Sequence, residues 1–275
     1  MIRLWPDREI HAETIRIGKV PAIIVRPKVP VKKAPGVLWI HGGGYILGMK
    51  EMVYMSRAID LVKTFGAVVI SPGYRLAFQA PYPAALQDCY RTLLYMKAHA
   101  GELGINKDQI MVGGESAGGG LCAALCMLAR DKGKVNIAFQ MPLYPMLDNL
   151  DTESSRDNHG KVWNTRRNHI GWRMYLRKSA KKKVSPYASP ARQINWKGLP
   201  PAYTFVGDGE PFYVETLEFV RCLQEAGIEA KADVYHVNMH AFDMLRPDLP
   251  ESVEAVRKFE EAFAFAARHY YAKID

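Results

Sequence analysis

A short glycine-rich sequence around Ser116 constrains the fold of this chain more than any other feature. The pattern Gly-x-Ser-x-Gly occurs as Gly114-Glu115-Ser116-Ala117-Gly118, between the apolar run 110–112 and a helical stretch that includes residues 121–125. A serine on a sharp strand-to-helix turn needs very small neighbours, and its hydroxyl lies at a helix N-terminus, where developing negative charge is favoured. This context predicts that Ser116 is a nucleophile. A glycine-rich tight turn with an N-cap serine is the alternative. A phosphate-binding loop is excluded because no Gly-Lys-Ser/Thr follows.

A second glycine cluster, His41-Gly42-Gly43-Gly44-Tyr45, directly follows the apolar strand expected at 37–40. Acyl transfer requires backbone N–H groups aimed at the oxygen of a tetrahedral intermediate, and glycines let the backbone approach that oxygen closely. The expected oxyanion-hole donors are the N–H groups of Gly42, Gly43 and Ala117, the residue after the nucleophile. The cluster loosely resembles a dinucleotide-binding turn. However, it departs from G-x-G-x-x-G, and no acidic residue ends the next strand.

Apolar strands and helical stretches alternate along the rest of the chain. We expect strands at 14–25, 36–40, 67–71, 109–112, 137–141, 203–206 and 230–236. We expect helices at 52–65, from 83 to about 101, at 116–130, 211–226 and 252–271. Continuous apolar strands separated by helices predict an α/β fold with a mostly parallel sheet covered on both faces.

Size and composition narrow the class of protein. With 275 residues, 48% of them hydrophobic, the chain has the size of one large α/β domain, and we expect residues 1–275 to form it. No apolar run is long enough to cross a bilayer. Residues 1–7 lack the apolar region of a signal peptide, so we expect a cytoplasmic protein. The four cysteines (Cys89, Cys122, Cys126 and Cys222) form no CxxC pair and no metal-like cluster, which favours thiols over disulfides.

About sixty residues separate the strand expected near Leu143 from the one expected near Tyr203. Loops of that length rarely stay structureless in a compact domain, so we expect residues 147–188 to fold over one end of the sheet as a lid, here called the lid segment. Residues 161–183 carry nine basic side chains and no acidic ones, within a net charge of +9. No nucleic-acid-binding motif accompanies this run. We therefore expect a solvated lid surface that attracts anionic substrates rather than a nucleic-acid partner.

The motifs HGGGY and GGESAGGG together resemble the hormone-sensitive-lipase-like family of α/β-hydrolases, which includes bacterial carboxylesterases. Residues 74–77, 82–88, 185–192 and 199–203 resemble the family as well, so the match runs from about residue 37 to 242. The resemblance implies an α/β-hydrolase fold and a serine esterase with a cap over its site, favouring short acyl chains. No metal or organic cofactor is implied.

The family's remaining catalytic positions map onto two later stretches. Its D-P-L-type motif matches Glu210-Pro211-Phe212, so Glu210 stands where the family usually has aspartate, and Asp208 is the rival acid. The family's histidine matches His240, which precedes Ala241-Phe242, whereas His236 lies within or at the end of the last expected strand. The chain order Ser116, Glu210, His240 is the order described for this fold.

Some positions depart from the family's pattern. Where the family reads Asp-Tyr-Arg-Leu-Ala-Pro-Glu, this chain has Gly73, Phe78 and Gln79 at the aspartate, proline and glutamate, which puts the local charge pairing of Arg75 in doubt.

From the motifs and the resemblance together, we expect a serine carboxylesterase with a Ser-His-Glu triad that acts on a small-molecule ester. The alternatives are an amidase, such as an arylformamidase-like hydrolase with the same triad, and a ligand-binding relative without catalysis. A homodimer is compatible with the sequence.

Overall fold

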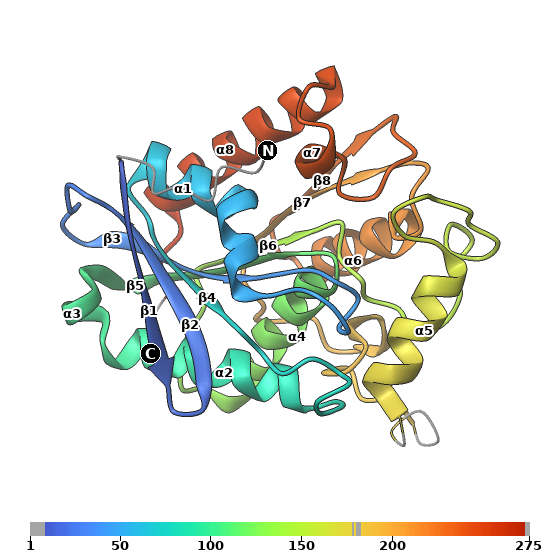
Figure 1. The fold of residues 1–275 in the computed structure, drawn as a ribbon, viewed down its shortest axis with the longest axis horizontal. Helices are drawn as coiled ribbons and strands as arrows, with labels where there is room; N and C mark the ends of the chain where they lie inside the picture. Colours follow the sequence, from blue (N-terminus) through green and yellow to red (C-terminus); the bar gives the residue numbers. More distant parts are fainter. Residues whose placement is uncertain (1–8, 178, 180–182, 273–275) are drawn as a thin grey trace.

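A computed structural model of the chain describes residues 9–177, 179 and 183–272 (Figure 1). These residues form an eight-stranded sheet in the order β1-β2-β4-β3-β5-β6-β7-β8. The pairs β1–β2 and β2–β4 are antiparallel, and all other neighbouring strands are parallel. The strands are β1 Ile10–Ile17, β2 Val20–Pro27, β3 Ala34–Ile40, β4 Val68–Pro72, β5 Ile105–Glu115, β6 Phe139–Leu143, β7 Ala202–Gly207 and β8 Ala230–Tyr235.

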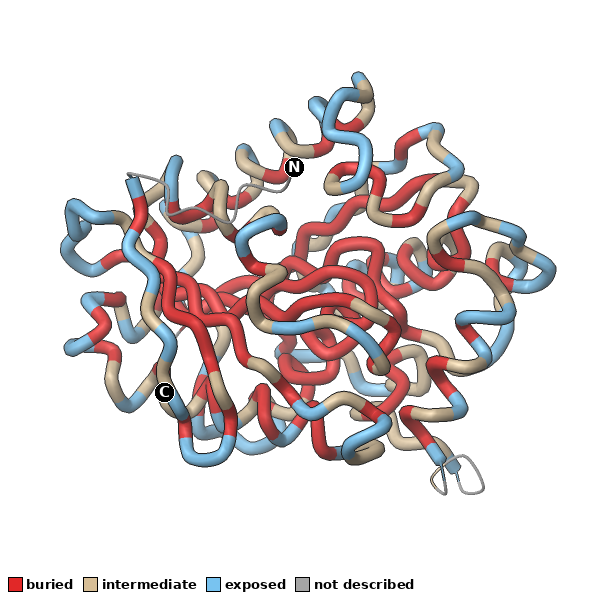
Figure 2. The backbone as a smooth tube through the Cα atoms, in the orientation of Figure 1, coloured by how far each residue is buried: buried red, intermediate tan, exposed pale blue. Residues whose placement is uncertain are grey.

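Helices cover both faces of this sheet, as the sequence predicts. On one face lie α1 Arg57–Phe65 and α8 Pro250–His269, and on the other lie α2 Ala84–Ala98, α3 Ala100–Leu103, α4 Ala117–Lys132 and α6 Tyr213–Glu225. Shorter elements are η1 Lys50–Met55, η3 Pro190–Arg192 and α7 Phe242–Leu245, and the lid segment contains α5 Thr165–Leu176. The strands β4, β6 and β7 are buried along their whole length because both of their faces are covered (Figure 2).

Alternate side chains of the central strands enter two separate hydrophobic clusters. Leu38 and Ile40 of β3 belong to the cluster under α2, α4 and α6. Val37 and Trp39 of the same strand belong to the cluster under α1 and α8, where the Trp39 ring packs edge-on against Phe259 at 6.1 Å. Burying each of these large side chains stabilises the fold by roughly 1.5–3 kcal/mol. The two clusters therefore hold the sheet from both faces. Because the strands are fixed in this way, the residues that follow their ends have defined positions.

Two expected elements differ from the structure. The strand expected at 14–25 is a hairpin of β1 and β2, which turns at Gly18-Lys19, where Gly18 adopts a φ of +61°. The helix expected at 52–65 divides into η1 and α1 at Ser56, whose hydroxyl accepts a hydrogen bond from the Ala58 N–H at 3.2 Å. A periodic apolar pattern extends through both pairs of elements, so it does not reveal a turn or a cap between them.

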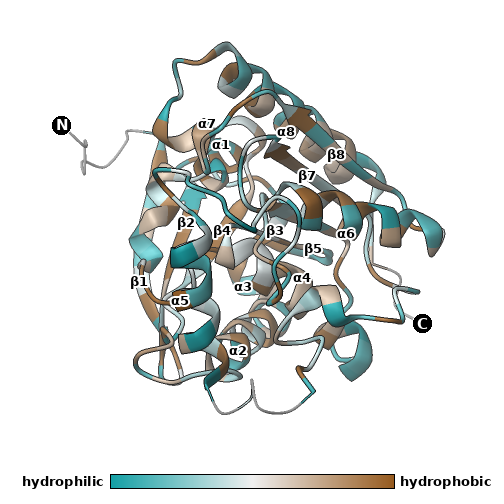
Figure 3. Cartoon of the chain, turned by 90° about the vertical axis from the view of Figure 1, so that its right-hand side faces the viewer, coloured by the Kyte–Doolittle hydropathy of each residue, from teal (hydrophilic) through white to brown (hydrophobic). Residues whose placement is uncertain are grey.

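The lid segment packs firmly on the body of the protein. The ring of Tyr175, on α5, stacks on Tyr45 with ring centroids 4.0 Å apart, and Trp172 packs beside both. Viewed from the lid side, α5 carries hydrophilic residues on its outer surface, including exposed Arg166 and Arg173 (Figure 3). The lysines at 178, 181 and 182 in the basic run lie outside the described residues, as does the N-terminal stretch 1–7 on which the expectation of no signal peptide depends.

No helix in the described parts of the chain combines the length and apolar character needed to span a membrane. All four cysteines are free thiols: Cys89, Cys122 and Cys126 are buried and Cys222 is partly exposed. The prediction of unpaired thiols is therefore confirmed.

Candidate active site

Ser116 lies between the end of β5 and the start of α4, in a strained conformation with φ 57° and ψ −120°. Three backbone hydrogen bonds hold it there: its N–H donates to Leu143 O, and its carbonyl accepts from the N–H groups of Gly120 and Met146, each at 3.0 Å. Such strain persists only where the surroundings fix the backbone, as they do here. The turn lifts the hydroxyl off the end of the sheet.

The flanking glycines let the turn pack against β3. A Cβ on Gly114 would lie 2.5 Å from the Ile40 carbonyl oxygen, and one on Gly118 would clash with the same oxygen. Alanine at either position would push the turn away from β3. The structure therefore gives the spacing of Gly-x-Ser-x-Gly a steric reason at this site.

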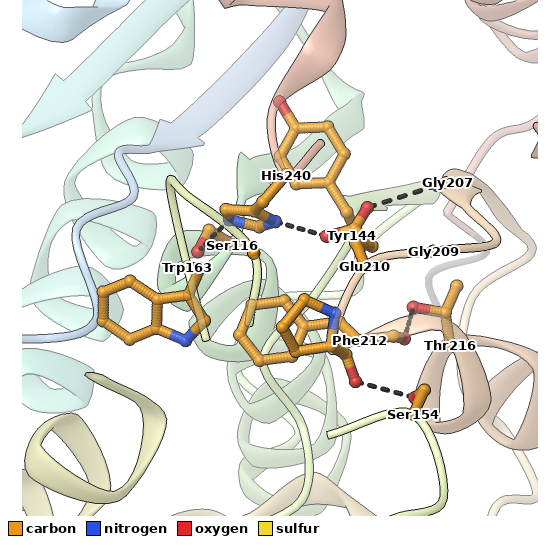
Figure 4. A network of polar contacts seen from close by, with 12 residues as sticks. Ser116, Tyr144, Ser154, Trp163, Gly207, Gly209, Glu210, Phe212, Thr216 and His240 are labelled. Atoms are coloured by element: carbon orange, nitrogen blue, oxygen red, sulfur yellow. Dashed lines mark hydrogen bonds and ion pairs between the residues drawn. The ribbon is translucent and has the colours of Figure 1, made fainter. Parts of the chain in front are cut away.

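His240 and Glu210 meet Ser116 in a buried chain of hydrogen bonds (Figure 4). The Ser116 Oγ lies 2.9 Å from His240 Nε2, and Glu210 Oε2 accepts from His240 Nδ1. Glu210 Oε1 accepts from the Gly207 N–H at 3.2 Å. Because a carboxylate accepts at Nδ1, that nitrogen carries the proton, which leaves Nε2 free to accept the proton of the serine hydroxyl.

Two aromatic rings fix the plane of His240. Tyr144, which follows β6, and Phe212, which precedes α6, each pack edge-on against the imidazole with centroids 5.1 Å apart and interplanar angles of 80° and 82°. Figure 4 shows both rings beside His240. Sequence reasoning assigned neither residue, although Phe212 lies within the motif that identified Glu210. Edge-to-face contacts favour one ring orientation and so support the histidine's geometry.

The rival acid and the rival histidine pair with each other on the surface. Asp208 Oδ2 lies 2.7 Å from His236 Nδ1, and the His236 side chain is 97% exposed. The hydrogen bond that His236 donates to Asp208 raises the pKa of His236. The structure therefore brings Ser116, Glu210 and His240 together and leaves Asp208 and His236 outside this group.

The glycine loop after β3 borders the serine. A Cβ on Gly42 would lie 3.3 Å from Ser116 Cβ, and Gly43 and Gly44 have φ values of +114° and +58°. The Gly42 carbonyl accepts from His41 Nδ1 at 2.8 Å, and the Gly43 carbonyl accepts from the N–H groups of Ile46 and Leu47. Both carbonyls are thus engaged within the loop. Ala117 is buried beside Ser116 at the first position of α4.

His41 supports this loop from below as a neutral group. Its ring is buried and stacks on Tyr74 with centroids 4.2 Å apart, and the Tyr74 hydroxyl donates to the His41 carbonyl at 2.9 Å. Burial lowers the pKa of His41 to about 4. A neutral ring with its proton on Nδ1 can hold the Gly42 carbonyl without a buried charge. Sequence reasoning did not assign this role to His41.

A buried carboxyl group lies directly before the nucleophile. Glu115 Oε1 accepts from Trp39 Nε1 at 2.8 Å, and burial raises the pKa of Glu115 to about 8. Near it, the fully buried Asp243 forms an ion pair with Arg57, from Oδ2 to Nε at 3.2 Å. Burial also raises the pKa of Asp243. These groups lie under the turn and do not contact the Ser116 hydroxyl.

Arg75, whose partner the sequence left in doubt, pairs with Asp88 on α2. Arg75 Nε and Nη2 donate to the two carboxylate oxygens of Asp88 at 2.8 and 2.9 Å, and the Arg75 backbone N–H donates to Oδ2 at 3.0 Å. The carboxylate partner of Arg75 thus comes from α2 and not from the loop that carries Arg75.

The indole of Trp163 lies on the glycine loop. A Cβ on Gly44 would clash with the Trp163 ring, whose Nε1 donates to Asn168 Oδ1 at 3.3 Å. Figure 4 shows Trp163 beside Ser116. The lid segment therefore provides an aromatic wall next to the nucleophile, while Trp172 and Tyr175 pack in the core.

An open cavity of about 710 Å³ lies on the outer side of the lid segment. Its lining includes Arg166, His169 and Arg173 of α5, and Ser116 and His240 are not part of it. Within the part of the chain that the structure describes, no group of three or more His, Cys, Asp or Glu side chains is arranged to hold a metal ion.

A serine on a strained strand-to-helix turn, with an acid and a histidine that follow later strands in that order, is the arrangement of the α/β-hydrolase class. A family model described as "alpha/beta hydrolase fold" matches residues 37–244. An arylesterase of Saccharolobus solfataricus is 32% identical over 223 residues, which cover 79% of this chain and 72% of that protein. The chain therefore belongs to the α/β-hydrolase fold family, which confirms the fold class and the resemblance to its hormone-sensitive-lipase-like members.

Solved structures agree with this assignment. A bacterial heroin esterase superposes with a TM-score of 0.86 at 31% identity, covering 95% of this chain and 84% of that chain. A hyperthermophilic esterase from the archaeon Pyrobaculum calidifontis superposes with a TM-score of 0.85 at 30% identity, covering 95% and 85%.

Proposed function

We propose that this chain is a serine carboxylesterase that hydrolyses short-chain carboxylic esters through Ser116, His240 and Glu210. One observation carries the proposal: both ring nitrogens of His240 are hydrogen-bonded, one to the serine hydroxyl and the other to a buried carboxylate. This is the relation between nucleophile, base and orienting acid that acyl transfer requires. The relatives named as esterases support the same reaction class.

The proposed mechanism follows from these contacts. His240 Nε2 accepts the Ser116 proton as Oγ attacks the ester carbonyl, and Glu210 stabilises the imidazolium through Nδ1. The N–H groups of Gly42, Gly43 and Ala117 would bind the oxyanion. Each such donor typically contributes about 10²–10³ to turnover. His240 then protonates the leaving alcohol, and water repeats the cycle on the acyl-enzyme. No step requires a metal or an organic cofactor.

Residues 1–275 would form a single domain, and the lid segment, residues 147–188, would be an insertion within it. The lid segment would limit the length of the acyl chain that the site accepts. The supporting contact is that of Trp163, whose ring lies on Gly44 of the oxyanion loop. A large ring at this position leaves less room for a long acyl group beside Ser116. The basic outer surface of α5 would attract anionic esters electrostatically. A cytoplasmic location and a homodimer stay predictions.

The test uses p-nitrophenyl esters of increasing acyl length, with and without a serine-reactive organophosphonate. We expect hydrolysis to be lost in step with labelling of Ser116, as mapped by mass spectrometry. Turnover should be highest for short acyl chains. Ser116→Ala should abolish turnover while the protein stays folded. If Ser116→Ala keeps full activity, the proposed nucleophile is wrong. If amides are hydrolysed and matched esters are not, the chain is an amidase with the same triad.

A further inference from the structure

The loop that carries Glu210 is hydrogen-bonded to the lid segment on both sides of that residue. Asn158 Nδ2 donates to the Gly209 carbonyl at 3.2 Å, directly before Glu210. The Ser154 hydroxyl donates to the Pro211 carbonyl at 2.7 Å, directly after it. Figure 4 shows the hydrogen bond from Ser154 to this carbonyl as a dashed line. Two lid side chains therefore bind the backbone carbonyls of the residues on either side of the proposed triad acid.

Ser154 also completes the start of α6. The N-cap residue of this helix, Phe212, makes no side-chain cap hydrogen bond, and the Val214 N–H donates to Ser154 Oγ at 3.1 Å. The first N–H groups of a helix have no partner within it and need an acceptor from elsewhere. Here the acceptor comes from the lid segment, about sixty residues earlier in the sequence. Ser154 thus joins the acid loop and the helix after it into one unit.

The part of the lid segment that carries these two side chains, residues 154–158, is itself held by hydrogen bonds. Thr165, the first residue of α5, accepts from the Asn158 N–H and donates to the Ser155 carbonyl, each at 2.7 Å. Asn158 Nδ2 also donates to the Ser154 carbonyl at 3.1 Å. Residues 154–158 therefore form a braced turn at the base of α5, so they can hold the acid loop in place and do not simply follow it.

On its other side the acid loop is hydrogen-bonded to the exit of β8. The Asp208 N–H donates to Tyr235 O at 2.9 Å and the Gly209 N–H donates to Val237 O at 3.3 Å. A Cβ on Gly209 would lie 2.7 Å from Asn238 Cβ, so the loop already lies close to the segment that leads to His240. The lid contacts and the β8 contacts therefore hold the backbone of the loop from two sides.

We infer that Ser154 and Asn158 are positioning residues that clamp the acid loop and so set the place of Glu210 against His240. This inference rests on the proposed function. Neither residue is hydrogen-bonded to Ser116 or His240, so we place their effect on the reaction at Glu210. A displacement of about 1 Å at a catalytic group can cost about 10²-fold in rate. We therefore expect loss of either side chain to lower kcat by roughly ten- to a hundredfold, while KM changes little.

The experiment compares Ser154→Ala, Asn158→Ala and Ser154→Thr with Asn164→Ala on p-nitrophenyl acetate. Asn164 is the matched control, because it lies in the lid segment and caps α5 through the Arg167 N–H without touching the acid loop. The folded concentration of each variant is measured by circular dichroism. We expect Ser154→Ala and Asn158→Ala to lower kcat with KM within about twofold. Ser154→Thr, which keeps the hydroxyl, should restore kcat, and Asn164→Ala should stay near wild type.

A second comparison separates positioning from general damage. Ser154→Ala is also measured in a Glu210→Ala background, with the rate of Ser116→Ala as the baseline. If Ser154 acts through Glu210, it should change kcat less than twofold once Glu210 is gone. An equal loss in both backgrounds, or wild-type kcat in Ser154→Ala and Asn158→Ala, would overturn the inference. Wild-type kcat in Glu210→Ala alone would instead refute the proposed triad, and the clamp with it.

Discussion

Glu115 allows the cost of a buried carboxyl group to be measured separately from catalysis. Its side chain is buried under the turn that carries Ser116, and the indole of Trp39 donates a hydrogen bond to Oε1 at 2.8 Å. Burial raises its pKa to about 8, against about 4.5 in the unfolded chain. Between these two values the folded protein binds a proton at Glu115 that the unfolded chain releases. Stability from this group is therefore fully present below about pH 4.5 and is lost as pH rises to about 8.

The size of this effect follows from the shift. A difference of about 3.5 pH units at about 1.4 kcal/mol per unit gives about 5 kcal/mol of unfolding free energy lost across that window. Glu115→Gln removes the titration and keeps an oxygen that can accept from Trp39. We therefore expect the free energy of unfolding of the variant, relative to wild type, to rise by about 5 kcal/mol between pH 4.5 and 8 and to be constant above it.

The assay is urea unfolding of both proteins at half-unit steps from pH 4.5 to 9. Comparing the two proteins at each pH cancels every other titrating group, including His41. Any constant cost of the amide appears as an offset and not as a slope. If the two stability curves run parallel across this range, Glu115 ionises in the folded protein as it does in the unfolded chain. Burial would then not control its charge.

Three further predictions follow from single side chains. Gly44→Ala should lower kcat/KM by about 10²-fold or more, because its φ is +58° and its Cβ would clash with Trp163. Gly44→Ala/Trp163→Ala should recover part of that loss, and no recovery would exclude the clash as the cause. Glu215→Leu should lower the unfolding free energy by roughly 3 kcal/mol in denaturant titrations, because it leaves the buried N–H groups of Leu147 and Asp148 without their acceptor. Glu215→Gln keeps an oxygen that can accept from both N–H groups and should cost about 1 kcal/mol or less, since burial raises the pKa of Glu215 and so favours the uncharged form that glutamine mimics; equal losses would contradict this. In NMR titrations the ring signals of His41 should stay unshifted down to about pH 5, whereas His236, whose pKa is raised by Asp208, should titrate above pH 6.5; a shared midpoint would refute the assigned environments.

The candidate site could be predicted from the sequence because short local motifs mark its residues. Gly-x-Ser-x-Gly requires small residues where the turn meets Ile40, and the structure shows that contact at Gly114. Parallel strands place their carboxyl ends at one edge of the sheet, so the residues that follow β3, β5, β7 and β8 lie at the same edge in the structure. The three residues Ser116, Glu210 and His240 are brought together by that topology, although they lie far apart in the chain.

What the sequence did not reveal depends on contacts between distant segments. The edge-on packing of Tyr144 and Phe212 against His240 has no sequence pattern, since the sequence alone does not distinguish these two residues from other buried aromatic residues. The pairing of Arg75 with Asp88 was missed because the acid lies on a helix thirteen residues away. The break at Ser56 was missed because apolar spacing continues through a cap. In each case the partner, not the residue itself, decides the role.

Strand register explains why Glu210 rather than Asp208 reaches the active site. The parallel pairing of β7 with β8 ends at Gly207 opposite Tyr235, and the next residues, Asp208 and His236, continue that register into solvent as an exposed ion pair. Two residues after the end of β7, the chain turns at Gly209. A side chain at this position would clash with Asn238, so only glycine allows this close approach. The segment after β8 is longer by two residues, so His240 comes opposite Glu210. The buried pair of Glu210 and His240 differs from this exposed pair because the turn at Gly209 carries Glu210 beyond the paired parts of β7 and β8. Glu210 and His240 therefore lie over Ser116.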